Sequence, residues 1–452
     1  MSQAHGRSPQ GPAGGDGGGD GGDGWDPDSR EARLTRATQV RELVDAFAAV
    51  GVDVGVGGED GDAGDRFDEM AFLYARGAVL TRDADVARVR RALGLDERPP
   101  AKDDGDERAR RRRPGRGRER AGSSAGLTRI ELDGRDTLEA VAELDRVLGP
   151  GVATPDHVLH VCPKGYACPA TEPVPSDGPA DPAPRDPALG TGVRVVVVDT
   201  GLVGELAQKV DVLAGVTGDE EDASAVGRYR GHGSFIAGIV KAMAPAAEVD
   251  VEAMLWVGGG ILESDLAPAL GRALESVPDV ISLSAGATTR HGHPLLALEA
   301  FWEHGLRHVK GTVLVCAAGN NGDRGPFWPA TSPWSVAVGA LEPDGSRAPY
   351  SNHGSWVDVW ARGSDLVAPY PVGAYTYAWP PHVGETASFG SGWASWSGTS
   401  FATPLVAGLV AARASWSGES ARVAARSLVR AARAHATPYV GAVLEPGMAD
   451  AP

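Results

Sequence analysis

Residues 398–410 read Gly-Thr-Ser-Phe-Ala-Thr-Pro-Leu-Val-Ala-Gly-Leu-Val, a small polar opening followed by an apolar run. Thr399 suits the cap of a helix, and Pro404 stands early enough in that helix for its missing N–H group to cost little. Ser400 then lies where the helix dipole and the free backbone N–H groups favour negative charge. The stretch therefore predicts a nucleophilic serine at the start of a buried helix.

Two further motifs supply an acid and a base. Residues 193–198 contain five valines, which is typical of a parallel strand buried on both faces, and Asp199 follows at its C-terminal end. Sites form at that edge of open α/β sheets. His232 stands between two glycines before an apolar run, so we expect it at a helix start. A serine hydroxyl needs an imidazole to take its proton, and a carboxylate to orient that imidazole. The sequence predicts that Ser400 attacks, His232 transfers protons and Asp199 orients His232.

A third motif supplies an amide group. Residues 313–319 read as another buried strand, and Asn320 follows it. An amide there can donate a hydrogen bond to the oxyanion of a tetrahedral intermediate, together with the backbone N–H of Ser400. Taken singly, Asp199 and Asn320 are ordinary turn residues and His232 is an ordinary core histidine. Their occurrence together and in this order favours the catalytic interpretation.

These motifs resemble those of the subtilases, the subtilisin-type serine endopeptidases. Asp-Thr-Gly begins at Asp199, His-Gly at His232, Ala-Ala-Gly-Asn ends at Asn320, and Gly-Thr-Ser-x-Ala-x-Pro-x-x-x-Gly surrounds Ser400. The resemblance covers about residues 190–417. Ser234 departs from it mildly, since threonine is usual there, and the Gly-x-Ser-x-Gly motif of α/β-hydrolases is absent around the serine.

The resemblance implies an α/β fold, a seven-stranded parallel sheet with helices on both faces. It implies that Ser284, Ala285 and Gly286 line a cleft in which an extended polypeptide substrate pairs main chain to main chain. It assigns no cofactor to this chain. Family members often bind calcium, and residues 218–222 are the acidic candidate, with a solvated loop as the competing interpretation. We assign no metal site.

Two alternatives to a peptidase stay open at this point. One is a catalytically idle binding or regulatory protein that keeps the fold, and the other is a hydrolase of esters. Two aromatic features also allow two interpretations each: Phe327 and Trp328 narrow a specificity pocket or fill the core, and the aromatic side chains in residues 361–398 bind peptide or pack a long loop flanking Ser400.

Composition restricts the partners that we expect. The chain has 452 residues and a net charge of −17, which argues against general binding of nucleic acid. No apolar run is long enough to predict a membrane span, and the first residues lack the apolar core of a secretory signal, so we expect a cytoplasmic protein. Cys162 and Cys168 read as free thiols, with a short disulfide-closed loop as the alternative, and Cys316 as a buried thiol.

The rest of the chain divides by composition. Short strands alternating with two helices predict a small α+β module, ferredoxin-like and similar in pattern to a subtilase propeptide, with an unrelated accessory domain as the alternative. We expect this module to occupy the cleft until the Pro-rich linker behind it is cut. The predicted segments are a disordered Gly/Asp-rich tail (1–30), the α+β module (31–162) with a basic loop (108–120), the linker (163–190), the catalytic domain (191–440) and a C-terminal tail (441–452). Within the module we expect strands at 71–75, 78–80, 127–132 and 157–161 and helices at 83–93 and 136–148.

Overall fold

The computed structural model describes residues 30–58, 61–95, 126–161 and 171–448. The predicted tail up to residue 29, the basic loop, Cys162, Cys168 and the first part of the predicted linker lie outside the described residues.

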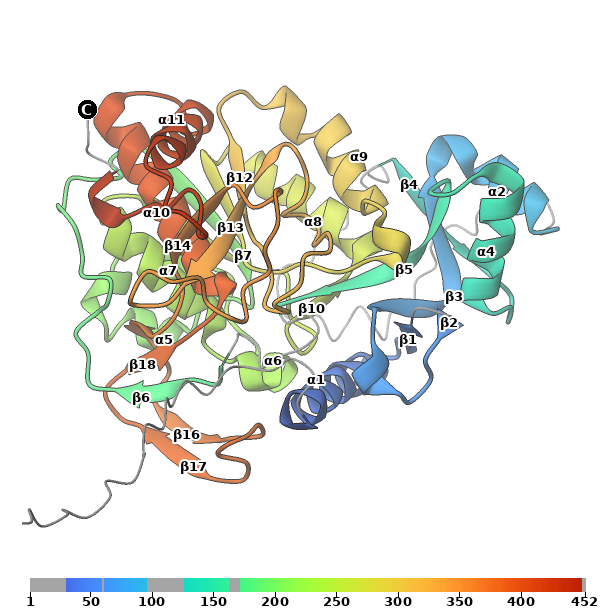
Figure 1. Ribbon diagram of the computed structural model, residues 1–452, viewed down its shortest axis with the longest axis horizontal. Coiled ribbons are helices and arrows are strands. Elements are labelled where there is room, and N and C mark those ends of the chain that lie inside the picture. The colour runs from blue at the N-terminus through green and yellow to red at the C-terminus, as the bar shows by residue number, and fades with distance from the viewer. Residues whose placement is uncertain (1–29, 59–60, 96–125, 162–170, 449–452) are drawn as a thin grey trace, which may run out of the picture.

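The larger part of the molecule is built on seven parallel strands in the order β14-β13-β12-β11-β7-β9-β8. Alternate valines of the central strand β7 (Arg194–Asp199) enter two different cores. Val195 and Val197 pack with α7 and α10, and Val196 and Val198 pack with α8 and α9. Helices therefore cover both faces of the sheet, as Figure 1 shows, and the predicted α/β fold is confirmed. The other strands are β8 (Thr217–Gly218), β9 (Glu248–Ala253), β11 (Val280–Leu283), β12 (Val313–Ala317), β13 (Ser335–Leu341) and β14 (Val359–Arg362), and the helices are α5 (Gly204–Ala207), α6 (Ala223–Val226), α7 (His232–Met243), α8 (Glu263–Glu275), α9 (Leu296–His304), α10 (Thr399–Ser417) and α11 (Ala421–Ala434).

The N-terminal module supplies most strands of a second, antiparallel sheet. Its long strand β3 (Phe72–Arg82) pairs with β1, β4 and β5, and it joins the two strands that we expect at 71–75 and 78–80 into one. One helix that the sequence analysis does not predict, α1 (Arg30–Ala49), precedes the sheet and buries Phe47 against it. The remaining elements are β1 (Val54–Gly58), β2 (Gly61–Asp62), α2 (Val86–Ala92), β4 (Leu127–Glu131), α4 (Thr137–Leu148) and β5 (Ala153–His160).

The strand β5 connects this module to the larger part of the molecule. Its other edge pairs antiparallel with β10 (Gly260–Leu262), so one sheet runs in the order β10-β5-β3-β1-β2 across both parts. Buried His157 of β5 contacts Glu263 at 2.8 Å, and Arg82 of β3 pairs with Glu299 at 2.9 Å. The module is therefore attached by main-chain hydrogen bonds as well as by ion pairs.

The described part of the predicted linker is not a free spacer. Within residues 171–190, β6 (Val174–Ser176) pairs with β18 (Trp393–Trp396), which in turn pairs with β15 (Leu366–Pro369). The predicted aromatic loop before Ser400 contains β15, β18 and the hairpin of β16 (Gly373–Thr376) and β17 (Thr386–Phe389). In the predicted C-terminal tail, Leu444 is buried and its N–H donates to the carbonyl of Trp360 in β14, so the described part of that segment packs on the sheet.

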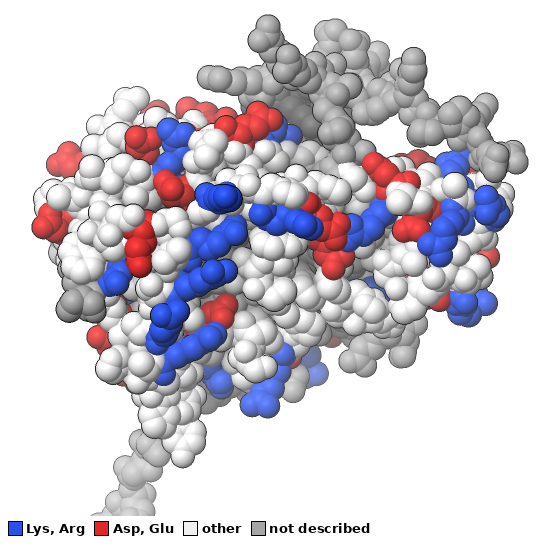
Figure 2. All heavy atoms as spheres, turned by 90° about the horizontal axis from the view of Figure 1, so that it is seen from above, with Lys and Arg blue, Asp and Glu red and all other residues white. Residues whose placement is uncertain are grey.

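The surface carries both signs of charge despite the net charge of −17. Figure 2 shows lysine and arginine side chains in a band across one half of the face seen from above, with acidic side chains scattered around it. Within the described ranges, no helix has the length and apolar character needed to span a bilayer.

Candidate active site

Asp199 and His232 come from two elements that meet at the C-terminal edge of the parallel sheet. Asp199 is the last residue of β7, and His232 is the first residue of α7, preceded by Gly231 with φ 81°. The imidazole Nδ1 lies 2.7 Å from Oδ1 of Asp199, and both side chains are fully buried. A buried carboxylate at this distance fixes the imidazole with its proton on Nδ1, so Nε2 is left as the acceptor.

Ser400 lies at the start of α10, one residue after Thr399, and is 1% exposed. Its hydroxyl donates a long hydrogen bond, 3.5 Å, to the carbonyl of Ser284, while the hydroxyl of Ser284 donates to the carbonyl of Ser400 at 2.9 Å. Nε2 of His232 makes no hydrogen bond to any described residue. In this structure the hydroxyl of Ser400 is therefore hydrogen-bonded to Ser284 and not to the imidazole. Such contacts are often long before substrate binds.

Aromatic side chains enclose the imidazole. The ring of His232 lies 5.5 Å from that of Trp396 and 5.4 Å from that of Phe401, measured between centroids. Trp396 is 2% exposed and Phe401 is fully buried. These rings exclude water from one side of the imidazole.

Most of the aromatic side chains in residues 361–398 are buried: Tyr370, Tyr377, Trp379, Phe389 and Trp396.

Asn320 follows β12, and its side chain is held by the start of α10. Its Oδ1 accepts hydrogen bonds from the backbone N–H of Thr399 at 2.9 Å and from the hydroxyl of Thr399 at 2.8 Å. These two bonds fix the plane of the amide next to Ser400 and leave Nδ2 as the end of the amide that can donate. The structure therefore brings Asn320 to the same helix start as the serine.

The predicted cleft strand pairs with the protein's own chain. His160, the last residue of β5, exchanges two hydrogen bonds of 3.1 Å with Gly286, and the N–H of Val161 donates to the carbonyl of Gly259 at 2.9 Å. An extended segment thus lies between Ser284, Ala285 and Gly286 on one side and β10 on the other. Its next residue in the chain is Cys162, which lies outside the described residues.

Phe327 and Trp328 form a wall behind this strand. Phe327 is 1% exposed, and Trp328 exchanges backbone hydrogen bonds with Ala287 at 2.8 and 2.9 Å. A Cβ atom at Gly286 would lie 2.4 Å from the Phe327 ring and 2.5 Å from the carbonyl oxygen of Trp328. Only glycine fits between the cleft strand and this wall.

We expect Gly286→Ala to lower the free energy of unfolding by about 1–3 kcal/mol, the usual cost of overpacking a rigid core. Gly271→Ala is the matched control, because Gly271 is exposed on α8 with no atom within 4 Å of the added Cβ. That control gains about 0.4–1 kcal/mol from helix propensity. Denaturant unfolding of both variants measures the difference, and equal stabilities would contradict the close fit.

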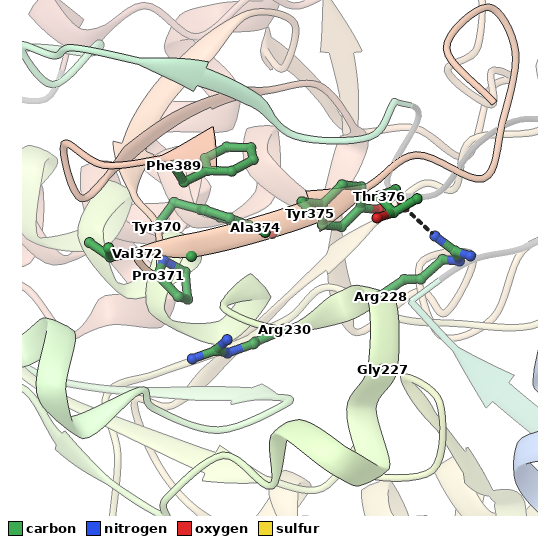
Figure 3. Close-up of a pocket in the computed structure, with 11 residues that line it drawn as sticks. Gly227, Arg228, Arg230, Tyr370, Pro371, Val372, Ala374, Tyr375, Thr376 and Phe389 are labelled. Atoms are coloured by element: carbon green, nitrogen blue, oxygen red, sulfur yellow. Dashed lines mark hydrogen bonds between the residues drawn. The ribbon is translucent and has the colours of Figure 1, made fainter. Parts of the chain in front are cut away.

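A pocket of about 190 Å³ adjoins the start of α7 (Figure 3). Arg228 and Arg230 line it from one side, and the side chains of Tyr370 and Tyr375 line it from the other. Arg228 donates to the carbonyl of Thr376 at 2.9 Å across one end. The pocket contains neither the serine nor the imidazole, so it is a neighbour of the site and not its centre.

The acidic loop at residues 218–222 is exposed from 218 to 220, as expected of a solvated loop, but one of its members is buried. Glu221 is only 9% exposed, so it is not a solvated loop residue, and its carboxylate accepts hydrogen bonds from Thr200 and from Gly231. In the described part of the chain, no group of three or more histidine, cysteine, aspartate or glutamate side chains is arranged to hold a metal ion. The sequence reasoning missed Glu221 because an acidic run on a loop carries no sign of which member is buried.

The histidines of β5 take part in packing. His157 contacts Glu263 through Nδ1, and its Nε2 accepts a hydrogen bond from the backbone N–H of Arg290 at 3.3 Å. Burial lowers the pKa of His160 to about 3, so this side chain stays neutral in the cleft. Cys316 is a free, fully buried thiol in β12.

Comparisons with known proteins agree on one family. The model of the Subtilase family, Peptidase_S8, matches residues 190–441. Thermitase from Thermoactinomyces vulgaris is 30% identical over 244 residues, which cover 52% of this chain and 79% of thermitase. A thermophilic serine proteinase from Bacillus sp. (strain AK1) is 34% identical over 238 residues, or 50% of this chain and 53% of that protein.

One solved structure resembles more of the chain. Fervidolysin from Fervidobacterium pennivorans, described as a keratinolytic enzyme related to subtilisin, aligns with a TM-score of 0.52 at 18% identity. The alignment covers 84% of this chain and 61% of fervidolysin, so the likeness in fold reaches beyond the residues that the family model matches.

Proposed function

We propose that this chain, which belongs to the subtilase family of serine endopeptidases, cleaves polypeptides through an acyl-enzyme formed on Ser400. The assignment of residues rests on the contact of 2.7 Å between Nδ1 of His232 and Oδ1 of Asp199. Ser400 lies at the start of another helix, α10. A buried Asp–His pair beside a serine at a helix N-terminus is the arrangement that acyl transfer requires.

The attack begins when the hydroxyl of Ser400 turns from the carbonyl of Ser284 to Nε2 of His232. The imidazole takes the proton as Ser400 Oγ bonds to the peptide carbonyl carbon, and Asp199 stabilises the imidazolium that forms. His232 then gives the proton to the leaving amine as the peptide C–N bond breaks. Water, deprotonated by the same imidazole, releases the acyl group and restores the serine.

The negative charge of the tetrahedral intermediate forms on the former carbonyl oxygen. We assign its stabilisation to Nδ2 of Asn320 and to the backbone N–H of Ser400. The hydrogen bonds from Thr399 to Oδ1 of Asn320 support this role, because they hold the amide in place before the charge develops. The N-terminal end of helix α10, where the helix dipole is positive, also stabilises the negative charge on this oxygen.

The N-terminal module acts, in this proposal, as an inhibitor in cis. The residues 158–161 lie as an extended strand where a substrate would pair with Ser284, Ala285 and Gly286, and the whole of β5 is buried. A strand held on both edges by main-chain hydrogen bonds competes directly with a peptide that needs the same bonds. The accessory-domain alternative gives no reason for this occupancy.

The point of self-cleavage is narrowed by anchors on both sides of Ser400. Val161 is bound to Gly259 on one side. On the other, the carbonyl of Thr171 accepts a hydrogen bond from the indole of Trp396 at 2.7 Å, and its hydroxyl accepts one from the N–H of Ser397 at 3.2 Å. We therefore place the self-cleavage between these two anchors, within residues 161–171, which include the start of the predicted linker.

We expect the purified wild-type chain to be cut within residues 161–171 and Ser400→Ala to stay intact. Intact mass and N-terminal sequencing of both proteins check this. Full activity of an uncut wild-type chain would contradict inhibition in cis, and equal cutting of both proteins would show that another protease makes the cut.

A further inference from the structure

Glu221 lies buried between the loop after β7 and the start of α7. Its Oε2 and Oε1 accept hydrogen bonds from the backbone N–H of Gly231 at 2.7 and 3.0 Å. Oε2 also accepts a hydrogen bond of 3.0 Å from the hydroxyl of Thr200. Gly231 is the residue before His232, and Thr200 is the residue after Asp199, so this one carboxylate contacts the neighbours of both.

The network continues on the far side of the histidine. The hydroxyl of Thr200, which donates to Glu221, accepts a hydrogen bond from the backbone N–H of Gly233 at 3.1 Å. The backbone N–H of Thr200 donates to Oδ1 of Asp199 at 2.8 Å, the same oxygen that contacts the imidazole. The residues on both sides of His232, Gly231 and Gly233, are thus tied to Glu221, directly or through one hydroxyl.

We propose that Glu221 is a positioning residue for the proposed peptide hydrolysis: its carboxylate fixes the backbone on both sides of His232 and thereby the orientation of the imidazole against Asp199. The inference rests on the proposed function. It concerns a residue that no sequence motif of the site includes.

The network favours the ionised carboxylate, because both of its oxygens accept hydrogen bonds, from the N–H of Gly231 and from the hydroxyl of Thr200, and neither donates one. Burial raises the pKa of Glu221 to about 7, and the charge of Asp199 adds to this, while the hydrogen bonds from Gly231 and Thr200 and the charge of Arg230 lower it. Tyr370 is a further titratable group beside the network, and burial, followed by the charge of Glu221, raises its pKa.

Because its pKa is raised, the carboxyl group of Glu221 does not increase the free energy of unfolding when it is ionised. The ordinary pKa is 4.5, so the contribution of Glu221 to stability is present below about pH 4.5 and is lost as the pH rises through about 7. An ionised group kept at a cost in stability, next to a reacting histidine, is characteristic of functional sites.

The kinetic test compares Glu221→Gln and Glu221→Ala with the control Glu220→Gln. Glu220 precedes Glu221 in the sequence, and its side chain is exposed. We expect Glu221→Ala to lower kcat by about 10- to 100-fold with KM within about twofold, the usual effect of a small misplacement of a catalytic group. Glu220→Gln leaves both constants unchanged. In Glu221→Gln the acid limb of the pH profile of kcat/KM becomes shallower by one proton, since one of the required ionisations is removed.

A second measurement does not depend on activity. The proton on Nδ1 of His232 gives a low-field NMR signal while it is held against Asp199, and the Ser400→Ala chain, in which the proposed self-cleavage is blocked, provides the background. We expect Glu221→Ala to broaden or shift this signal and Glu220→Gln to leave it in place. Thr200→Val, which removes one link without a charge, gives an intermediate effect and serves if Glu221→Ala does not fold.

The results separate the two proposals. An unchanged NMR signal and unchanged kcat in the Glu221 variants of an active enzyme would overturn the positioning role alone. A wild-type enzyme without peptidase activity would overturn the proposed function, and the NMR signal would still report whether Glu221 orients His232.

Discussion

Replacing Ser400 by alanine is expected to lower peptide turnover by about 10⁶-fold, the loss known for the serine of subtilisin. The variant keeps the buried Asp199–His232 pair and the proposed oxyanion donors, but it has no oxygen that can form the acyl-enzyme. The change removes one atom from a residue that is 1% exposed, so the fold is retained. Initial rates with a fluorogenic peptide and labelling by a fluorophosphonate measure the two consequences, since the reagent reacts only with an activated serine.

Ser417→Ala is the matched control for this variant. Ser417 is the last residue of the same helix, and its hydroxyl donates only to local groups, the carbonyl of Arg413 and the carboxylate of Glu419. We expect the control to label and to cleave like the wild type. A wild-type enzyme that neither labels nor cleaves after removal of the N-terminal module would support the idle alternative, and faster cleavage of esters than of peptides in the labelled enzyme would support the esterase.

Asn320→Ala is expected to lower kcat by about 10²- to 10³-fold and to leave a measurable remainder. The variant loses one of two proposed donors to the oxyanion, while the backbone N–H of Ser400 remains. Because the donor acts on charge that develops in the transition state, KM changes little and the loss is in kcat. Steady-state kinetics with one peptide substrate separate the two constants.

The comparison of the two variants tests the assigned roles. Asn320→Ala retains the nucleophile and its base, so it is expected to label with a fluorophosphonate, whereas Ser400→Ala does not. Complete and equal loss of peptide turnover in both variants would contradict the assignment of Asn320 as an oxyanion donor. Thr399→Ser, which keeps the hydroxyl bonded to Oδ1 of Asn320, is expected to stay close to the wild type.

The catalytic part of the fold could be predicted because its signals are local. The valines at 193–198 need no partner to indicate a strand buried on both faces, and the structure places them in two cores at once. The apolar run after Gly398 predicts a helix, and α10 begins at Thr399. The expected cap is wrong, because Gly398 is the N-cap residue and the hydroxyl of Thr399 donates to Oδ1 of Asn320 instead. In both cases the residue that matters follows directly from the element that carries it.

The N-terminal module is harder to read because its packing runs against propensity. The strand β1 has the sequence Val-Gly-Val-Gly-Gly, which is too rich in glycine to indicate a strand. The structure supplies the reason for the glycines: a Cβ at Gly55 would collide with the ring of Tyr74, and one at Gly57 with the ring of Phe72. The aromatic rings of β3 cover the bare backbone of β1, a tertiary effect that no local pattern contains.

The cleft also depends on information that lies far apart in the chain. That Ser284, Ala285 and Gly286 form an extended edge follows from the resemblance to subtilases, but that His160 occupies this edge does not follow from any motif. The pairing joins residues more than a hundred positions apart. The role of Glu221 is not predicted for a similar reason, since its hydrogen-bond partners Thr200 and Gly231 come close to it only in the folded chain.

If the module inhibits in cis as proposed, the shared strand β5 means that breaking one peptide bond does not free the active site. A chain nicked between residues 161 and 171 keeps the ladder from β10 through β5 to β3, together with the ion pairs of Arg82 and the contact of His157 with Glu263. The two fragments would co-elute as a single latent particle. Proteolysis would then begin only after the smaller fragment dissociates or is digested. The lag before activity would become shorter on dilution and would not depend on the rate of nicking.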